Sequence, residues 1–226
     1  MTFRNFFLLG VVVIATVFLP SCSITQKNGA GLTAYHSYDR PTKLPENPDA
    51  VTVKVSLSTQ RTYVMEGSEI LLSMPVSVGA PGNSTPTGNF TIFNKVEKKR
   101  EQTHGYAYQG DQVKQVSIGD KPAGWSFKGT PTPYWCEFKA NYAFHTGWIK
   151  HYPCTNGCIR MHENLAPKFY RLVKIGTPVS IAYSQPEDLI VGNIPLPPDA
   201  GPLPEYKGSM YTGDGYFRQH KTPEYH

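Results

Sequence analysis

Short segments of alternating apolar residues, separated by turns rich in glycine and proline, constrain the fold of this chain most. In "VTVKVSL", residues 51–57, every second residue is apolar, as in a strand with one buried face. The stretch 62–79 predicts a hairpin whose turn is Glu66-Gly67-Ser68. The 226 residues include 20 Gly and 20 Pro, which favours a loop-rich, mainly β protein over a helical bundle. Further strands are predicted at 85–96, 134–138, 143–145 and 177–183.

One segment, residues 163–176, predicts a helix. Its leucines, phenylalanine and valine share one face, Asn164 can cap the start and Gly176 can close the end. Pro167 is compatible with this helix only within the first turn, where its missing N–H costs no hydrogen bond. From residue 184 to 226 the chain is rich in proline with scattered tyrosines, so we expect an extension that wraps the surface or lacks order.

The N-terminus is typical of an exported protein. One arginine precedes a twelve-residue apolar run, "LLGVVVIATVFL", which is too short to span a bilayer. The charge and the run together match a signal peptide, residues 1–21. The run ends in "LPSC", which resembles a bacterial lipobox, so we expect cleavage before Cys22 and lipid attachment to it. Residues 22–49 predict a flexible tether, and Ser23 favours an outer-membrane anchor facing the periplasm. An ordinary signal peptide or an uncleaved anchor is the alternative.

The net charge of +5 is a mild excess that suits anionic polymers such as cell wall. It is too small to indicate nucleic-acid binding, and the sequence contains no motif for that function. It also contains no glycine loop of the kind that cradles phosphate.

The stretch "HTGWIKHYPCTNGCIRM", residues 145–161, concentrates reactive side chains. A cysteine nucleophile needs a base and a positive potential, because the thiolate is the reactive form. Cys158 follows the turn pair Asn156-Gly157 and precedes the predicted helix. Backbone amides of that turn could receive an oxyanion. His145 is a candidate base, and Arg160 adds a fixed positive charge.

Each of these features has an ordinary structural alternative. Asn-Gly pairs often form simple turns, a histidine after an apolar strand is often structural, and an arginine near a helix start often faces solvent. A zinc site formed by His145, His151, Cys154 and Cys158 is a further alternative, although the spacing lacks a C-x-x-C pair.

The stretch and its flanks resemble the YkuD-type L,D-transpeptidase catalytic domain. That family has His-x-Gly, then Ser/Thr-His-Gly-Cys-x-Arg, then a helix and a Gly-Thr-Pro-Val strand. Here the matching segments are "HTG", "TNGCIR" and "GTPV", and the earlier "STPTG" resembles the family's Thr-Pro-Thr-Gly segment. The resemblance covers residues 50–183, which we predict to be the catalytic domain. It implies the family's mainly β, sandwich- or barrel-like fold with one or two short helices.

The resemblance implies a role for each matching residue. Cys158 corresponds to the nucleophile and His145 to the base, while the backbone carbonyl of Thr146 would orient the imidazole. The backbone N–H groups of Gly157 and Cys158 correspond to the oxyanion donors, and Arg160 to the arginine of the motif.

Two other positions in the motif bear on function. Gly147 completes His-x-Gly and is expected to border the substrate site. Asn156 stands where the family usually has histidine; it cannot act as a base, although its amide can form hydrogen bonds. If that second histidine were the essential base, this chain would be inactive.

The resemblance also implies a substrate and a reaction. Members attack peptidoglycan stem peptides at the third residue, form a cysteine thioester and pass the acyl group to an amine, without a cofactor or metal. We predict this L,D-transpeptidase activity. A non-catalytic peptidoglycan-binding lipoprotein and an L,D-carboxypeptidase-type cysteine hydrolase are the alternatives.

The remaining cysteines allow two pairings in an oxidising compartment. With Cys22 lipidated and Cys158 as nucleophile, Cys136 and Cys154 are left as a possible disulfide. A bond between Cys154 and Cys158 would instead silence the enzyme until it was reduced.

Overall fold

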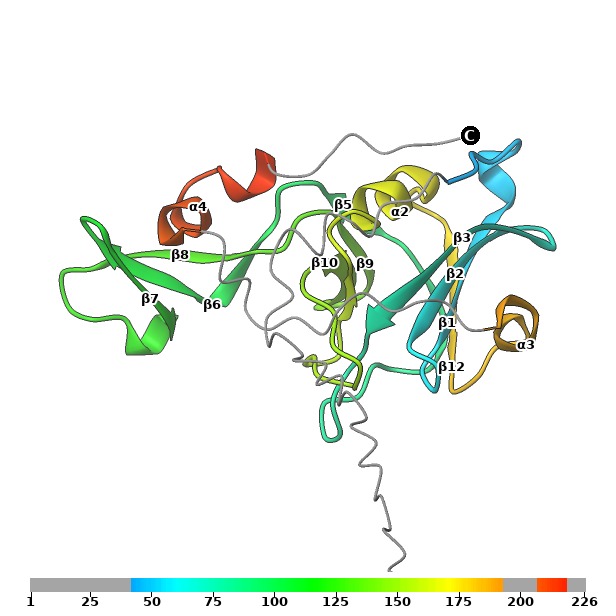
Figure 1. Ribbon diagram of the computed structural model, residues 1–226, viewed down its shortest axis with the longest axis horizontal. Helices are drawn as coiled ribbons and strands as arrows, with labels where there is room; N and C mark the ends of the chain where they lie inside the picture. Colours follow the sequence, from blue (N-terminus) through cyan, green and yellow to red (C-terminus); the bar gives the residue numbers. More distant parts are fainter. Residues whose placement is uncertain (1–41, 193–206, 219–226) are drawn as a thin grey trace, which may run out of the picture.

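The computed structural model describes residues 42–192 and 207–218, which form a main body and a projecting arm (Figure 1). The body is built on a curled nine-stranded sheet with the order β4-β12-β1-β2-β3-β11-β10-β9-β5. The β1–β12 and β10–β11 pairs are parallel, and the other neighbours are antiparallel. The strands of this sheet are β1 (Val51–Ser56), β2 (Arg61–Glu66), β3 (Glu69–Ser77), β4 (Gly88–Thr91), β5 (Asn94–Val96), β9 (Trp135–Lys139), β10 (Tyr142–Thr146), β11 (Ile159–Met161) and β12 (Pro178–Ala182).

The predicted mainly β class is confirmed, and so is the hairpin. β2 ends at Glu66 and β3 begins at Glu69, with Gly67 at φ 61° in the turn. Alternate valines of β1 are almost completely buried, as the period-2 pattern predicts. They pack with inward-facing residues of the other strands into one continuous apolar core.

The predicted helix is shorter than its sequence pattern. α2 runs from Ala166 to Leu172, and Pro167 lies in its first turn, as predicted. Leu165, not Asn164, is the N-cap residue, and no side chain caps this end. Gly176 has φ 98°, but it lies in the turn after the helix. α2 covers the core through its apolar face, where the ring centroids of Phe144 and Phe169 are 4.6 Å apart.

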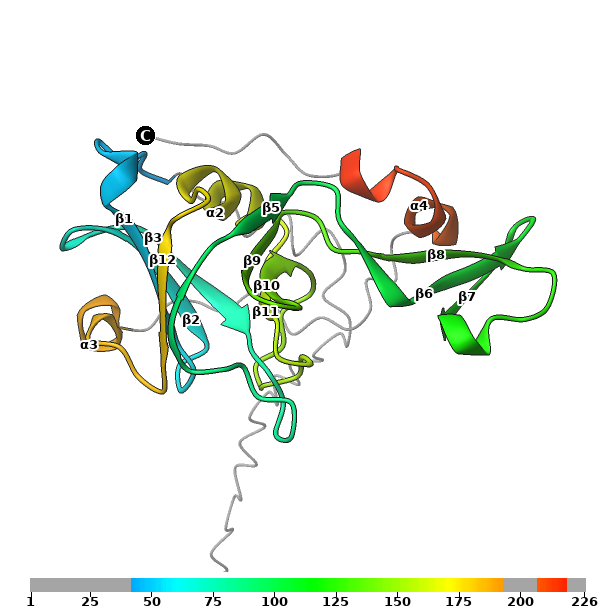
Figure 2. The same cartoon turned by 180° about the vertical axis from the view of Figure 1, so that it is seen from behind.

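The projecting arm was not predicted from the sequence. It is a three-stranded antiparallel sheet of order β7-β6-β8, which extends away from the body in both views (Figures 1 and 2). Most of its strand residues are exposed or only half-buried, so its sequence lacks a regular apolar alternation. Its strands are β6 (Arg100–Gln109), β7 (Gln112–Ser117) and β8 (Ser126–Pro131).

Part of the predicted proline-rich extension folds onto the arm. α4 (Gly208–Thr212) lies against β6, β7 and β8. The rings of Tyr106 and Tyr211 stack with centroids 4.6 Å apart. Arg100 Nη1 donates to the carbonyl oxygens of Gly129 and Tyr211 at 2.9 and 2.7 Å. The stacked tyrosine rings and the hydrogen bonds from Arg100 to backbone carbonyls hold this segment to the arm.

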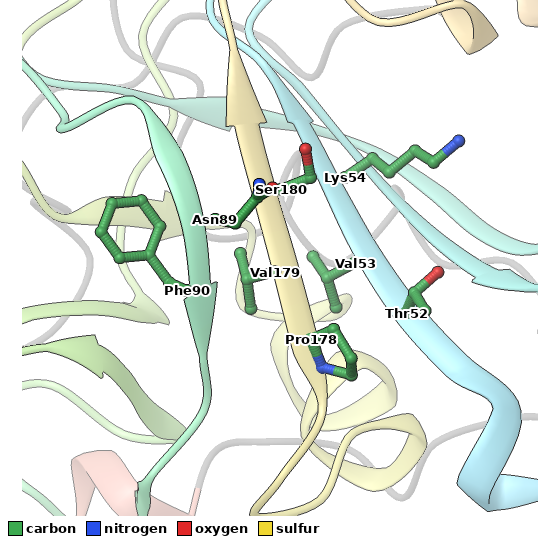
Figure 3. Close-up of a pocket in the computed structure, with 8 residues that line it drawn as sticks. All are labelled: Thr52, Val53, Lys54, Asn89, Phe90, Pro178, Val179 and Ser180. Carbon is green, nitrogen blue, oxygen red and sulfur yellow. The ribbon is translucent and has the colours of Figure 1, made fainter.

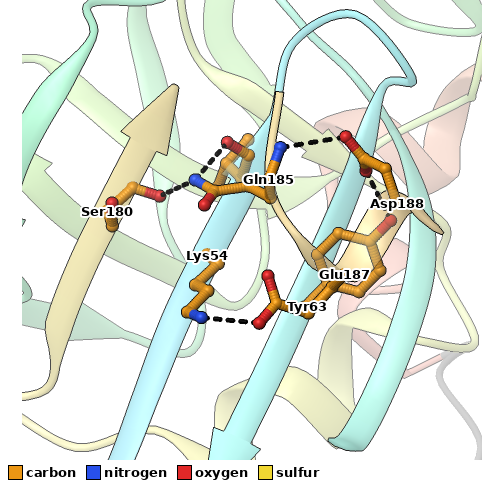
Figure 4. Close-up of polar contacts among 7 residues, drawn as sticks. Lys54, Tyr63, Ser180, Gln185, Glu187 and Asp188 are labelled. Carbon is orange, nitrogen blue, oxygen red and sulfur yellow. Dashed lines mark hydrogen bonds and ion pairs between the residues drawn. The ribbon is translucent and has the colours of Figure 1, made fainter. Parts of the chain in front are cut away.

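The start of the same extension is hydrogen-bonded to strands β1 and β2 of the main sheet (Figure 4). Asp188 of α3 (Glu187–Val191) accepts hydrogen bonds from Ser56 Oγ and Tyr63 OH, both at 2.7 Å, and from the Gln185 backbone N–H at 2.9 Å. Burial opposes the charge of this carboxylate, but the hydrogen bonds outweigh it and lower the pKa of Asp188.

The end of the predicted tether also contacts the body. Thr42 is buried, and the Glu66 carboxylate accepts hydrogen bonds from the backbone N–H groups of Glu46 and Asn47, at 2.9 and 2.5 Å. Parts of residues 42–49 are therefore attached to the body, whereas the predicted signal peptide and Cys22 lie outside the described residues. In the part of the chain that the structure describes, no helix is long and apolar enough to cross a membrane.

A hollow of about 280 Å³ lies over β1, β4 and β12 (Figure 3). It is mainly apolar, and it contains none of the residues that the sequence nominates for catalysis. Its lining residues are Thr52, Val53, Lys54, Asn89, Phe90, Pro178, Val179 and Ser180.

Candidate active site

The parallel pairing of β10 and β11 brings the nominated base and nucleophile to one face of the sheet. His145 is paired with Arg160. Cys158 lies two residues before Arg160, directly before β11, so its side chain projects from the same face. The intervening Ile159 and its partner Phe144 point into the core. Cys158 was expected to precede the helix directly; a short strand separates the two instead.

The ring of His145 is held in one orientation. Its Nδ1 lies 2.8 Å from the backbone oxygen of Thr146, the contact that the resemblance implies. A carbonyl can only accept, so Nδ1 carries the proton and the lone pair of the neutral ring is on Nε2. Burial and the nearby positive charge of Arg160 lower the pKa of His145 to about 4, although the Thr146 hydrogen bond opposes them. The imidazole is therefore neutral at neutral pH and can accept a proton.

The indole of Trp135 completes the setting of this ring. Trp135, on β9, stacks on His145 with centroids 5.8 Å apart and planes 23° from parallel. The stack restricts the imidazole from one side, while the Thr146 carbonyl fixes its edge. Sequence reasoning missed this residue, because its position beside His145 depends on the β9–β10 pairing.

The thiol of Cys158 is partly exposed and is protonated in the free protein. Its Sγ donates to the backbone oxygen of Asn141 at 3.6 Å. Burial raises the pKa of Cys158; the Ala143 N–H and the Arg160 charge act in the opposite direction, and two carboxylates add to the rise. At rest, a neutral thiol and a neutral imidazole therefore lie on the same face of the sheet, and they are not an ion pair.

Two buried threonine hydroxyls shape the turn before the nucleophile. Thr85 Oγ1 donates to the Gly157 carbonyl and accepts from the Gly79 N–H, both at 2.9 Å. Thr155 Oγ1 donates to the Cys158 carbonyl at 2.6 Å and accepts from the Gly157 N–H at 3.1 Å. Neither threonine was nominated from the sequence, although Thr85 lies in the "STPTG" segment that carries the resemblance.

Gly157 has a different role from the one expected. Its N–H was expected to be an oxyanion donor, but it is directed at Thr155 Oγ1. Gly157 instead allows the turn itself: its φ is 106°, and a Cβ there would lie 2.4 Å from Tyr142 Cε1. The Asn156 side chain beside it is exposed.

Gly147 makes room for Arg160. A Cβ on Gly147 would lie 2.3 Å from Arg160 Cδ, so only glycine lets the arginine pass over this position. Arg160 Nη1 then donates to the Trp148 carbonyl at 3.4 Å and lies 3.8 Å from Cys154 Sγ. The guanidinium carbon is 5.2 Å from the Trp148 ring centroid, a cation–π contact. The positive charge is thereby fixed beside His145.

The expected disulfide is absent. Cys136, Cys154 and Cys158 are all free. Cys136 is completely buried in the apolar core, where burial raises its pKa to about 12. Cys154 contacts Arg160, whose side chain lies on the opposite face of the sheet. The sheet therefore separates the two thiols. Among the described residues, moreover, no three His, Cys, Asp or Glu side chains are grouped as metal ligands.

Comparison with protein families matches residues 50–181 to the YkuD model, the L,D-transpeptidase catalytic domain. This match spans more than half of the chain. The chain belongs to the L,D-transpeptidase catalytic domain family. A search of the curated proteins finds no match.

Several solved structures are similar to this L,D-transpeptidase domain at low sequence identity. An L,D-transpeptidase from Mycobacterium smegmatis is 18% identical, with a TM-score of 0.46, covering 59% of this chain and 58% of that chain. One from Stackebrandtia nassauensis is 19% identical, with a TM-score of 0.44, covering 68% and 65%. An L,D-transpeptidase in complex with imipenem is 21% identical, with a TM-score of 0.45, covering 59% of each chain. The chain thus spans less than two thirds of the length of these relatives.

Proposed function

We propose that this chain is an L,D-transpeptidase that acts on peptidoglycan stem peptides through a thioester on Cys158. One observation carries the proposal: the β10–β11 register puts Cys158 on the face where His145 has its Nδ1 bound to Thr146 and its Nε2 lone pair available. Membership of the family supplies the reaction class.

In the acylation step, His145 Nε2 takes the proton from Cys158 as the sulfur attacks the stem carbonyl. Proton transfer accompanies attack because both groups are neutral at rest, as the raised pKa of the thiol and the lowered pKa of the imidazole indicate. The backbone N–H of Cys158 and the positive charge of Arg160 stabilise the developing oxyanion. The imidazolium then protonates the departing amine, which leaves a thioester.

In the second step, neutral His145 removes a proton from an amine acceptor, which attacks the thioester and releases Cys158. The product is a cross-link or another amide joined to the stem peptide. Asn156 does not take part as a base, and its exposed side chain is compatible with substitution of the family histidine at this position. No step needs a cofactor.

The setting of the reaction is the cell envelope. The family acts on cell wall, and residues 1–21 have the pattern of an export signal ending before Cys22. We propose that Cys22 is lipidated and anchors the domain at the outer membrane, facing the periplasm.

The proposal is tested by incubating the protein with a disaccharide-tetrapeptide and analysing the products by mass spectrometry. Wild type is expected to form dimers, or amides when a D-amino acid is supplied, and Cys158→Ala is expected to form neither. Products from water alone, even with excess amine, would identify a hydrolase. The same absence of turnover in both proteins would contradict the proposal.

A further inference from the structure

The Glu137 carboxylate lies at the centre of a hydrogen-bond network that the proposed mechanism does not use. Glu137 is on β9, between Asn94 of β5 and Ala143 of β10. Its Oε2 accepts from Asn94 Nδ2 at 3.0 Å and from Trp135 Nε1 at 3.3 Å. Its Oε1 accepts from the backbone N–H of Asn141 at 3.0 Å. Three donors from three different places are thereby tied to one side chain.

Two of these donors contact the reacting pair. Trp135 is the residue whose indole stacks on His145. Asn141 is the residue whose carbonyl accepts the Cys158 thiol hydrogen bond, and its φ of 65° is a conformation that non-glycine residues rarely adopt. Its N–H bond to Glu137 stabilises that conformation. The same carboxylate therefore fixes the group that orients the base and the group that orients the nucleophile.

Glu137 also contributes charge to the site. Glu137 on β9 is paired with Ala143 on β10. On its other side, β10 pairs with β11, and Cys158 directly precedes β11. The charged groups that act on Cys158 are Arg160 from β11, which lowers its pKa, and Glu137 from β9 with Glu101 from β6, which raise it. His145, on the same face of the sheet, is neutral at neutral pH.

We infer that Glu137 is a positioning residue of this active site, which holds both Cys158 and His145 in place through Asn141 and Trp135. This inference rests on the proposed function, since it assigns Glu137 to the same reaction. Glu137 touches neither reacting atom, and its charge favours the protonated thiol. Both substitutions remove the charge. Glu137→Gln keeps one acceptor oxygen and so can retain only the donors on one side, whereas Glu137→Ala removes every one of these hydrogen bonds.

The test compares wild type, Glu137→Gln and Glu137→Ala in the full chain. Two rates are measured: alkylation of Cys158 by iodoacetamide between pH 5 and 10, and acylation by imipenem, followed by intact mass. Glu66→Gln is the matched control, because Glu66 is also a strand glutamate that accepts two backbone N–H groups, but at the far end of the β2–β3 hairpin. Thermal melts establish that each variant is folded.

Both Glu137 variants are expected to move the midpoint of the alkylation profile to lower pH, because a negative charge near the thiolate is lost. Glu137→Ala is also expected to slow acylation about tenfold or more, because Trp135 and Asn141 are released. Glu66→Gln should change neither readout. Unchanged midpoints in both variants, with unchanged acylation in whichever of them folds, would overturn the inference.

The two proposals fail in different ways. If wild type is not acylated, the proposed function fails. A midpoint that Glu137→Ala lowers further than Glu137→Gln, because the Asn141 carbonyl that binds the thiol is also released, would still support the positioning of Cys158, and equal midpoints would contradict it. If wild type is acylated and both Glu137 variants match it in rate and midpoint, only the inference about Glu137 fails.

Discussion

Substituting alanine for Gly147 tests how the site fixes its positive charge. The new Cβ would lie 2.3 Å from Arg160 Cδ and 2.5 Å from its Cγ. Carbon atoms in contact prefer about 3.5–4.0 Å, so the overlap exceeds about 1 Å. The clash falls on the middle of the arginine side chain, whose end is held by the Trp148 carbonyl and ring. Either the backbone around residue 147 is therefore strained, or the Arg160 side chain moves away from Trp148.

The magnitude follows from these two outcomes. Overpacking of this kind costs about 1–3 kcal/mol, which lowers Tm by about 2–12 °C in a domain of this size. If Arg160 moves instead, its charge no longer lowers the pKa of Cys158 or of His145. The thiol is then harder to ionise, and acylation by a carbapenem is expected to slow about tenfold.

The assay is a thermal melt together with an acylation time course for Gly147→Ala. Gly119→Ala is the matched control, because a Cβ at that glycine meets nothing within 4 Å. We expect the control to match wild type in both measurements. A Gly147→Ala protein with both the Tm and the acylation rate of wild type would refute the reasoning, because the arginine would then tolerate the overlap without consequence.

Three further predictions concern the framework. Thr85→Val leaves two buried backbone groups, including the Gly157 carbonyl, without their hydroxyl partner; urea unfolding should show a loss of about 2–4 kcal/mol, against none for exposed Thr91→Val. His145 has a folded pKa of about 4, below its unfolded value, so the unfolded chain binds more protons and the free energy of unfolding should fall by about 2–3 kcal/mol as pH drops from 6.5 to 4; His145→Gln should lose this dependence. Asp188→Asn should cost about 2 kcal/mol and speed hydrogen exchange of the α3 amides, whereas unchanged exchange would contradict the role given to that carboxylate.

The strands that sequence predicted well are those with one face in the main core. β1 shows period-2 burial over most of its length, and the β2–β3 hairpin has its glycine in the turn, so local pattern and global packing agree there. The arm strands failed this criterion because most of their side chains are exposed or only half-buried, and only a small tyrosine cluster packs against them. β11 has three residues, too few for any period to be read.

In the candidate site, too, some residues could be nominated from the sequence and others only from the structure. Cys158 and His145 could be nominated because their chemistry is visible in the sequence. Trp135 and Glu137 could not be, because their role depends on which strand lies beside β10. The register between distant strands is a tertiary property that local sequence does not encode.

The disulfide error has an identifiable cause. Cysteine counting treats any two remaining thiols as partners, but strand parity puts Cys136 on the same face as Phe138, in the core. Cys154, in the loop before the nucleophile, contacts Arg160 on the other face. Had the apolar alternation of β9 been given priority over the count, the pairing would have been rejected.

The measurement that tests the central claim most directly is the intact mass of the protein after incubation with a carbapenem, whose strained carbonyl is an acyl donor for a thiolate. We predict one adduct per chain in wild type. The adduct should be retained in Cys136→Ser and Cys154→Ser, the other free cysteines of the described residues, and lost in Cys158→Ala. An unmodified wild type, or an adduct that survives in Cys158→Ala, would contradict the assignment of Cys158 as the nucleophile.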